Sequence, residues 1–215
     1  KSMKIEFHTL YWPNTDQRIV DAHKAVMYKF GFHVNYTVQT IDHGEWMTNV
    51  LEKAKSEMIC FFDIDCVPLN VEEVMKFIYR ARFSKTFCGV AQVSNHIPPA
   101  QHIYAAPAFF VIHKECWNNI KVPMNAGSDG KRVGDVCELF TYAAEDNNVD
   151  FDLLIPTHYY KEPKEGIWNL ADKGCYGIGT IFDNAVYHLY QSRFAENVDI
   201  FSKHCDMIIN DTLNM

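Results

Sequence analysis

The sequence predicts an α/β domain with a central, mostly parallel mixed sheet that is flanked by helices. The first half of the chain alternates between short apolar runs of strand length and amphipathic stretches of helix length. Crossover connections of this kind place consecutive strands side by side and parallel. A second observation is the run Met58–Phe62, whose five residues are all apolar. Such a run is typical of a strand that is buried on both faces.

Each element of the first half has its own signal. The stretch 16–30 places its apolar residues on one helical face and ends at Gly31, a usual helix stop. Asn70 and Glu73 have the spacing of a capping box, which predicts the start of another helix. We expect strands at residues 4–11, 32–38 and 58–62, and helices at residues 16–30, 46–54 and from Asn70 onward.

The second half is less regular. Its patterns predict strands near residues 86–93, 107–112, 150–155 and 178–188, and helices near residues 114–119, 135–146 and 195–209. Two stretches that contain several Gly and Pro residues, 121–134 and 156–177, are expected to be loops. The second is long for a compact domain, so we expect a mobile lid there.

Composition limits the class of protein. The chain has 215 residues, of which 48% are hydrophobic, enough for one domain with a full core. The formal net charge of −7 argues against nucleic-acid binding. A protein this acidic also needs a cation in order to bind an anionic ligand. No apolar run reaches membrane-spanning length. We expect a single domain over residues 1–215 that is part of a longer, multi-domain polypeptide.

The cysteines indicate the compartment. The chain has seven, an odd number, and none of them form a CxxC pair. Several lie in apolar stretches, so we interpret them as reduced core thiols. This pattern predicts a cytoplasmic protein.

Two aspartates, Asp63 and Asp65, directly follow the Met58–Phe62 run. Packing does not explain them, because a buried carboxylate must be desolvated. The carboxyl end of a strand in an α/β sheet instead opens into a ligand crevice. Two oxygen ligands one residue apart suit Mg²⁺ or Mn²⁺, which in turn suits a diphosphate. A turn or helix cap would explain Asp63 alone, but not both carboxylates.

A second Asp-x-Asp occurs at Asp150 and Asp152. These residues precede their apolar run, so we expect them at the opposite edge of the sheet, where ligands do not usually bind.

Strand–helix alternation that leads to an apolar run and Asp-x-Asp, about sixty residues into the chain, resembles the GT-A (Rossmann-like) fold of nucleotide-sugar glycosyltransferases. Three later segments, 105–112, 134–139 and 186–192, are similar to parts of that family in order and spacing. The resemblance covers nearly the whole chain. Its specificity lies in the order of these parts, since no single motif is decisive.

The resemblance implies a divalent ion, Mn²⁺ or Mg²⁺, on the donor diphosphate. In this sequence Asp65 is then the expected direct ligand, and Asp63 supports the ion or reaches the donor ribose. His188 is implied as the third protein ligand. A lone histidine in an apolar strand is otherwise more often a core residue.

Donor-base contacts are expected from Thr9, Tyr11 and Asp42, at the ends of the first two strands. Tyr11 could stack on a uracil and Asp42 could accept from its ring N–H, although ordinary turn chemistry explains these residues equally well. His43 opens a helix at an edge that nucleotides commonly use.

The acceptor side is expected at Asp135 and Glu138, our two candidate catalytic residues. Asp135 can cap the predicted helix 135–146, contact the acceptor hydroxyl, or do both. It would be a general base in an inverting enzyme and a positioning group in a retaining one. Glu138, one turn further along, is its rival. The histidine in the site slightly favours a retaining enzyme over an inverting one.

The whole chain is also similar to glycosyltransferase domains encoded by chlorella viruses, at the N-terminal end of longer enzymes that build capsid glycans. This implies a hexosyltransferase that uses UDP-glucose or a UDP-rhamnose-like donor, with a glycan or glycoprotein as acceptor. It also implies the host cytoplasm as its location.

Three other functions remain open. An apolar strand followed by Asp63-Ile64-Asp65 also resembles haloacid-dehalogenase-type phosphatases, in which the first aspartate attacks phosphorus. That motif usually lies on the first strand, whereas two strand–helix units precede it here. A pyrophosphorylase-like nucleotidyltransferase would need an N-terminal glycine-rich, basic loop, which is missing. A non-catalytic sugar- or nucleotide-binding module would tolerate loss of Asp135 and of the metal.

Overall fold

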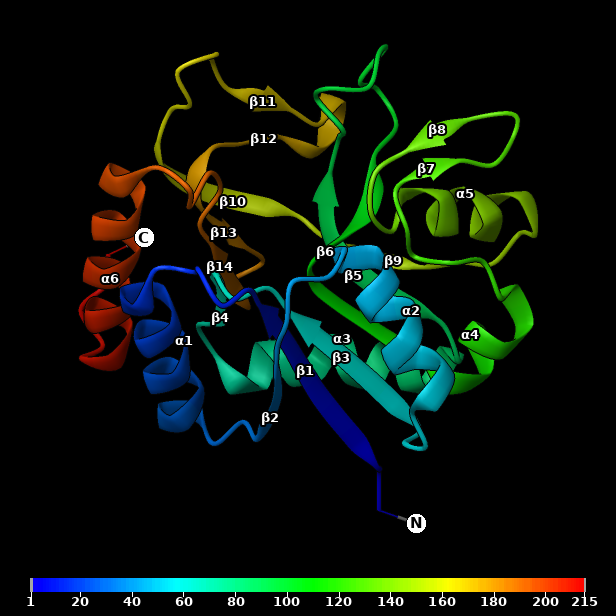
Figure 1. Cartoon of the computed structure of the whole chain (residues 1–215), viewed down its shortest axis with the longest axis horizontal. Coiled ribbons are helices and arrows are strands. Elements are labelled where there is room, and N and C mark those ends of the chain that lie inside the picture. The colour runs from blue at the N-terminus through cyan, green and yellow to red at the C-terminus, as the bar shows by residue number, and fades with distance from the viewer. Residues whose placement is uncertain (1, 215) are drawn as a thin grey trace.

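The computed structural model describes residues 2–214, which form two main sheets with helices packed around them (Figure 1). The larger sheet contains β1 (Ile5–Tyr11), β2 (Val34–Val38), β3 (Met58–Phe62), β5 (Phe87–Gln92), β6 (Tyr104–His113) and β9 (Asp152–Leu154). The smaller sheet contains β4 (Cys66–Pro68), β10 (Pro156–Lys161), β13 (Ile178–Phe182) and β14 (Val186–His188). The helices are α1 (Gln17–Phe30), α2 (His43–Lys53), α3 (Val71–Ser84), α4 (Lys114–Ile120), α5 (Glu138–Asp146) and α6 (Ala195–Ile209).

The larger sheet has the strand order β2-β1-β3-β6-β5-β9. β1 is parallel to β2 and β3, and β5 is parallel to β9. β6 is antiparallel to both of its neighbours, so it runs against the other five strands. The predicted α/β class with a mostly parallel mixed sheet is therefore confirmed.

β3 lies at the centre of this arrangement, and all five of its residues are buried. Cys60 and Phe62 pack on one face of the sheet with α3, whereas Ile59 and Phe61 pack on the other with α2, α4 and α5. Figure 1 shows α2 and α3 on opposite sides of the sheet. Burial on both faces explains why this strand has no polar alternation.

The smaller sheet is antiparallel and begins directly after the Asp-x-Asp segment. β4 pairs with β14, and Cys66 lies opposite His188. A third apolar cluster covers this sheet with residues from α1 and α6. This pairing connects the end of β3 to a strand from the last third of the chain.

Two predictions for the second half were wrong. The single strand expected at 178–188 is a hairpin, β13–β14, because Asp183 and Asn184 adopt positive φ angles of 47° and 53° and turn the chain. The loop expected at 156–177 begins with β10, which pairs with β13. It also contains a short hairpin, β11 (Trp168–Asn169) with β12 (Cys175–Tyr176). Alternating apolar residues in this stretch are too few to give a strand signal from sequence alone.

The other predicted loop, 121–134, also contains a short hairpin, β7 (Gly127–Ser128) with β8 (Val133–Gly134). The remaining helix and strand predictions agree with the observed elements within a few residues. Gly31 ends α1 in the left-handed conformation, with φ of 74°. Asn70 caps α3 by accepting from the Glu73 backbone N–H at 3.2 Å, as predicted.

The seven cysteines are free thiols, and all except Cys175 are buried. Among the helices formed by residues 2–214, none combines the length and the apolar character needed to cross a membrane.

Candidate active site

Asp63 and Asp65 lie where the two sheets meet. The Asp63 backbone N–H donates to the Ala108 carbonyl at 2.9 Å, which continues the β3–β6 ladder by one residue. The Cys66 N–H then donates to the Asp63 carbonyl at 2.9 Å and closes a tight turn into β4. β1, β2 and β3 are parallel, so their carboxyl ends share this edge. The pair thus occupies the edge where α/β sheets usually bind ligands.

The smaller sheet brings His188 to the aspartates. One ligand atom from each of Asp63, Asp65 and His188 lies within 4.8 Å of the other two. His188 Nε2 is 3.1 Å from Asp65 Oδ1, and the Asp65 carbonyl accepts from the Leu189 N–H at 2.9 Å. The His188 side chain is 7% exposed.

This cluster fits a divalent ion. Two carboxylates and one imidazole form a mixed oxygen and nitrogen donor set that suits Mn²⁺ or Mg²⁺. One ligand atom from each of the three residues is close enough to the others for all three to share one ion.

His43, the first residue of α2, also reaches the cluster. Its Nε2 lies 3.1 Å from Asp63 Oδ1, so the two side chains form an ion pair when the ring is protonated. Burial lowers the pKa of His43, yet the neighbouring carboxylates, above all Asp63, raise it overall. Burial raises the pKa of Asp63, and the surrounding histidines, above all His43, lower it overall. Sequence analysis placed His43 at this edge but did not pair it with Asp63.

The three predicted donor contacts have different surroundings. Thr9 is fully buried, and its hydroxyl has no hydrogen-bond partner within residues 2–214. Tyr11 is half-buried, and its ring meets the Tyr36 ring edge-on at 6.2 Å. Asp42 caps α2 by accepting from the Glu45 N–H at 3.0 Å. Donor binding by these residues stays a prediction.

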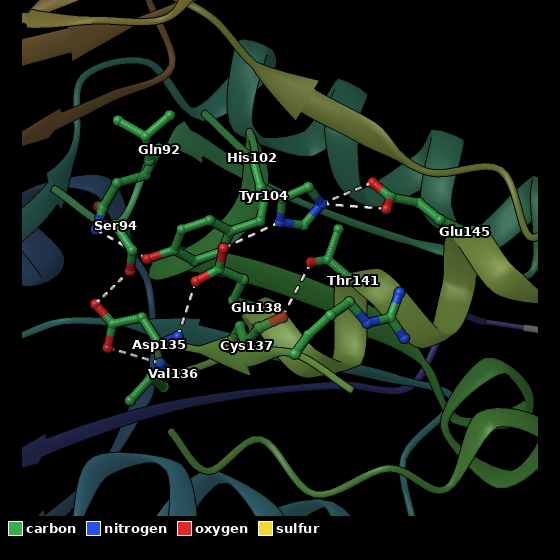
Figure 2. A network of polar contacts seen from close by, with 12 residues as sticks. Gln92, Ser94, His102, Tyr104, Asp135, Val136, Cys137, Glu138, Thr141 and Glu145 are labelled. Atoms are coloured by element: carbon green, nitrogen blue, oxygen red, sulfur yellow. Dashed lines mark hydrogen bonds and ion pairs between the residues drawn. The ribbon is translucent and has the colours of Figure 1, made fainter. Parts of the chain in front are cut away.

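The acceptor-side candidates belong to one polar network (Figure 2). Asp135 Oδ2 accepts from Ser94 Oγ at 3.1 Å, and its Oδ1 accepts from the Val136 N–H at 2.8 Å. Glu138 Oε2 accepts from the Asp135 N–H at 2.8 Å, while its Oε1 lies 3.0 Å from His102 Nδ1. Both carboxylates are therefore held in place.

The capping role expected for Asp135 was wrong in one respect. α5 begins at Glu138, and its N-cap position is Cys137, with φ of 69° and no side-chain cap. The tight turn formed by 135–137 separates Asp135 from the helix, so its carboxylate binds Ser94 instead. The Asp135 side chain is 26% exposed, whereas that of Glu138 is 4% exposed.

A pocket of about 350 Å³ lies beside this network. One wall is the loop around the cis Pro98–Pro99 bond, and the other contains His102, Glu138 and Tyr142. Ser94 also lines it, so the pocket reaches the side chain that holds Asp135.

Gln92, at the end of β5, links the two parts of the site. Its Nε2 donates to the Tyr104 hydroxyl at 3.1 Å, and its Oε1 accepts from the Tyr190 hydroxyl at 3.2 Å. The Tyr190 ring in turn meets the His188 ring at 4.1 Å. Sequence analysis missed Gln92 and Tyr190, because neither stands in a motif that signals chemistry.

No protein-family model matches the chain, and no curated protein matches it. Many solved structures are distantly similar, including the following three. A197 from STIV has a TM-score of 0.40 and 12% identity, over 59% of this chain and 72% of that one. A glycosyltransferase involved in the glycosylation of the major capsid of PBCV-1 has a TM-score of 0.35 and 14% identity, over 52% of this chain and 60% of that one. CMP:2-keto-3-deoxy-manno-octonic acid synthetase complexed with CTP has a TM-score of 0.41 and 7% identity, over 70% and 90%.

These similarities are too distant to assign a function to the chain. The α/β class follows from the strand order and the strand directions, and the functional hypothesis follows from the geometry of the site.

Proposed function

We propose that the protein is a metal-dependent glycosyltransferase that moves a sugar from a UDP-sugar to a hydroxyl of a glycan. The main support is the cluster of Asp63, Asp65 and His188 at the carboxyl edge of three parallel strands. A nucleoside diphosphate is the class of ligand that such an edge and such a cluster suit best. In less specific terms, the protein would be a transferase that uses a nucleotide substrate.

Asp65 and His188 would hold the ion, and Asp63, paired with His43, would support it. When bound, the ion would neutralise the charge that develops on the leaving diphosphate. The acidic chain itself has a formal net charge of −7 and would repel the diphosphate without a cation between them.

The donor base would lie near Tyr11 and Asp42, at the ends of β1 and β2. The Trp12 indole N–H donates to the Ile41 carbonyl at 3.0 Å, which keeps these two segments together. A uracil stacked on Tyr11 would then extend from the same edge as the metal cluster.

The acceptor hydroxyl would face Asp135, whose carboxylate is the more exposed of the two candidates. Asp135 would take the hydroxyl proton in an inverting reaction or orient the hydroxyl in a retaining one. Glu138 is less suited to direct contact, because its side chain is only 4% exposed. By resemblance, UDP-glucose or a UDP-rhamnose-like compound is the first donor to test and capsid glycans are the first acceptors.

The test is release of UDP from a panel of UDP-sugars, with Mn²⁺ and with EDTA. We expect activity with Mn²⁺, none with EDTA, and none in Asp65→Asn. The second Asp-x-Asp supplies a matched control, since Asp150→Asn makes the same chemical change two residues before β9 and should retain activity. Hydrolysis of p-nitrophenyl phosphate with no need for a nucleotide would instead support the phosphatase alternative.

A further inference from the structure

His102, in the segment between β5 and β6, bridges two carboxylates of α5 (Figure 2). Its Nδ1 lies 3.0 Å from Glu138 Oε1, and its Nε2 lies 3.1 Å from both carboxylate oxygens of Glu145. This histidine belongs to none of the proposed metal, donor or acceptor groups.

These distances constrain the protonation of the ring. A neutral imidazole has one N–H donor and one nitrogen lone pair, and an ionised carboxylate can only accept. In a neutral ring, one of the two nitrogens carries no proton. Its lone pair would then face the lone pairs of a carboxylate oxygen, which is repulsive. With Glu138 and Glu145 both ionised, both contacts are satisfied only by the imidazolium, which donates from both nitrogens. Burial lowers the pKa of His102, but Glu138 and Glu145 together raise it overall.

The ring has little freedom to move. It stacks on Tyr142 of α5 with centroids 3.6 Å apart and an interplanar angle of 9°. The Tyr104 ring of β6 is nearly parallel to it at 6.3 Å. Arg132 lies 4.2 Å from the Tyr142 ring and is itself held by Asp129 and Asp146. Glu138, Glu145, Tyr104 and Tyr142 are thus titratable groups that face the ring.

The contacts of His102 lead to the proposed acceptor group. Glu138 is buried, so its charge needs compensation, and His102 supplies the positive partner. The other Glu138 oxygen accepts from the Asp135 N–H at 2.8 Å. Asp135 is thereby fixed from its backbone side by Glu138 and from its carboxylate side by Ser94.

We propose that His102 is a positioning residue of the acceptor site. As an imidazolium it holds the Glu138 carboxylate, and through Glu138 it holds the backbone of Asp135 in the orientation that presents its carboxylate to the acceptor. This role rests on the proposed function, because it assumes that Asp135 meets an acceptor hydroxyl. It also predicts that activity falls at high pH as His102 loses its proton.

The first measurement is an NMR titration of the His102 ring in the protein without substrates. We expect the wild-type ring to be doubly protonated at pH 7. Glu145→Gln removes one of the two carboxylates and should lower the pKa of His102 by about one unit or more. Glu52→Gln, which removes a carboxylate from an exposed pair with Lys121, is the matched control and should not change it. A neutral His102 at pH 7 in the wild type would overturn the proposal.

The second measurement is the pH profile of kcat for sugar transfer. In Glu145→Gln, the fall of kcat at high pH should begin at a lower pH. The shift should equal the change in the pKa of His102 that the NMR titration measures. His102→Gln should lower kcat about 10- to 100-fold, as misplacement of a reacting group does, with Mn²⁺-dependent UDP affinity within about twofold of wild type. If Glu145→Gln changes the pKa of His102 but not the pH at which kcat falls, His102 has only a structural role.

Failure of the two proposals can be told apart. A wild-type protein that binds no UDP would overturn the proposed function, and with it the acceptor role of Asp135. A protein that transfers sugar normally after His102→Gln would overturn the positioning role alone. If His102→Gln does not fold, Glu145→Gln still separates the outcomes, because it changes only a half-exposed side chain.

Discussion

His188 Nε2 lies 3.1 Å from Asp65 Oδ1, although 123 positions separate the two residues along the chain. The contact is built by backbone pairing, since Cys66 of β4 lies opposite His188 of β14. The turn after β3 and the smaller sheet are therefore parts of one structural unit. It places an imidazole and two carboxylates together.

His188→Ala should weaken Mn²⁺-dependent UDP binding by about 10- to 100-fold, because it removes one of three groups around the proposed ion. Calorimetric titration of UDP at a fixed Mn²⁺ concentration measures this loss. His33→Ala, at an exposed position, is the control and should bind UDP like the wild type. Unchanged binding in His188→Ala would mean that the histidine is a core residue and not a ligand.

Stability at acid pH should depend on His23. Burial lowers the pKa of this fully buried histidine to about 3. The unfolded chain, with an ordinary pKa near 6.5, therefore binds the proton first, so stability should fall as the pH drops from about 6.5 toward 3.

His23→Gln should remove this contribution, which amounts to about 1.4 kcal/mol per pH unit at most. Glutamine can still pair with the Tyr36 hydroxyl, which lies 3.0 Å from His23 Nδ1. Urea unfolding between pH 4 and 6, on the wild type, His23→Gln and the exposed control His33→Gln, tests the sign and the slope. Identical slopes in all three proteins would show that His23 is not the responsible group.

Gly44, beside His43, should not tolerate a side chain. A Cβ at this position would lie 2.5 Å from the Asn125 Cα and 2.7 Å from the Met124 carbonyl oxygen, which are backbone atoms. Alanine is favoured over glycine in helices by about 1 kcal/mol, but overpacking costs about 1–3 kcal/mol or more. We expect the steric cost to exceed the gain, so Gly44→Ala should lower the free energy of unfolding.

Denaturant unfolding measures this change, with Ser84→Ala as a control at the exposed end of α3. A Gly44→Ala protein at least as stable as the wild type would show that α2 can move away from residues 124–125. Such movement would also be expected to disturb the contact between His43 and Asp63.

Local sequence signals predicted the elements that depend on local physics. Met58–Phe62 is a strand with the predicted bounds, because a run buried on both faces leaves a continuous apolar pattern. The final helix, 195–209, agrees with its apolar periodicity. The position of Asp63 and Asp65 at the carboxyl edge followed from the parallel strands, without any knowledge of side-chain contacts.

The parts that the sequence did not predict depend on distant pairings. β4 has only three residues, Cys66–Pro68, and forms because β14 is available to pair with it. His43 was expected at an edge that nucleotides commonly use, but its pairing with Asp63 was not expected. His102 lies in no motif and reaches Glu138 only through the fold. A histidine that bridges two glutamates of one helix from a separate segment leaves no periodic signal.

The central claim is a metal-bridged nucleotide site at Asp63, Asp65 and His188. Isothermal titration of UDP into the wild-type protein, with and without Mn²⁺, tests it most directly. We predict binding that requires Mn²⁺ and that is lost in Asp65→Ala. Binding that is equally strong without the metal, or that survives in Asp65→Ala, would contradict the claim.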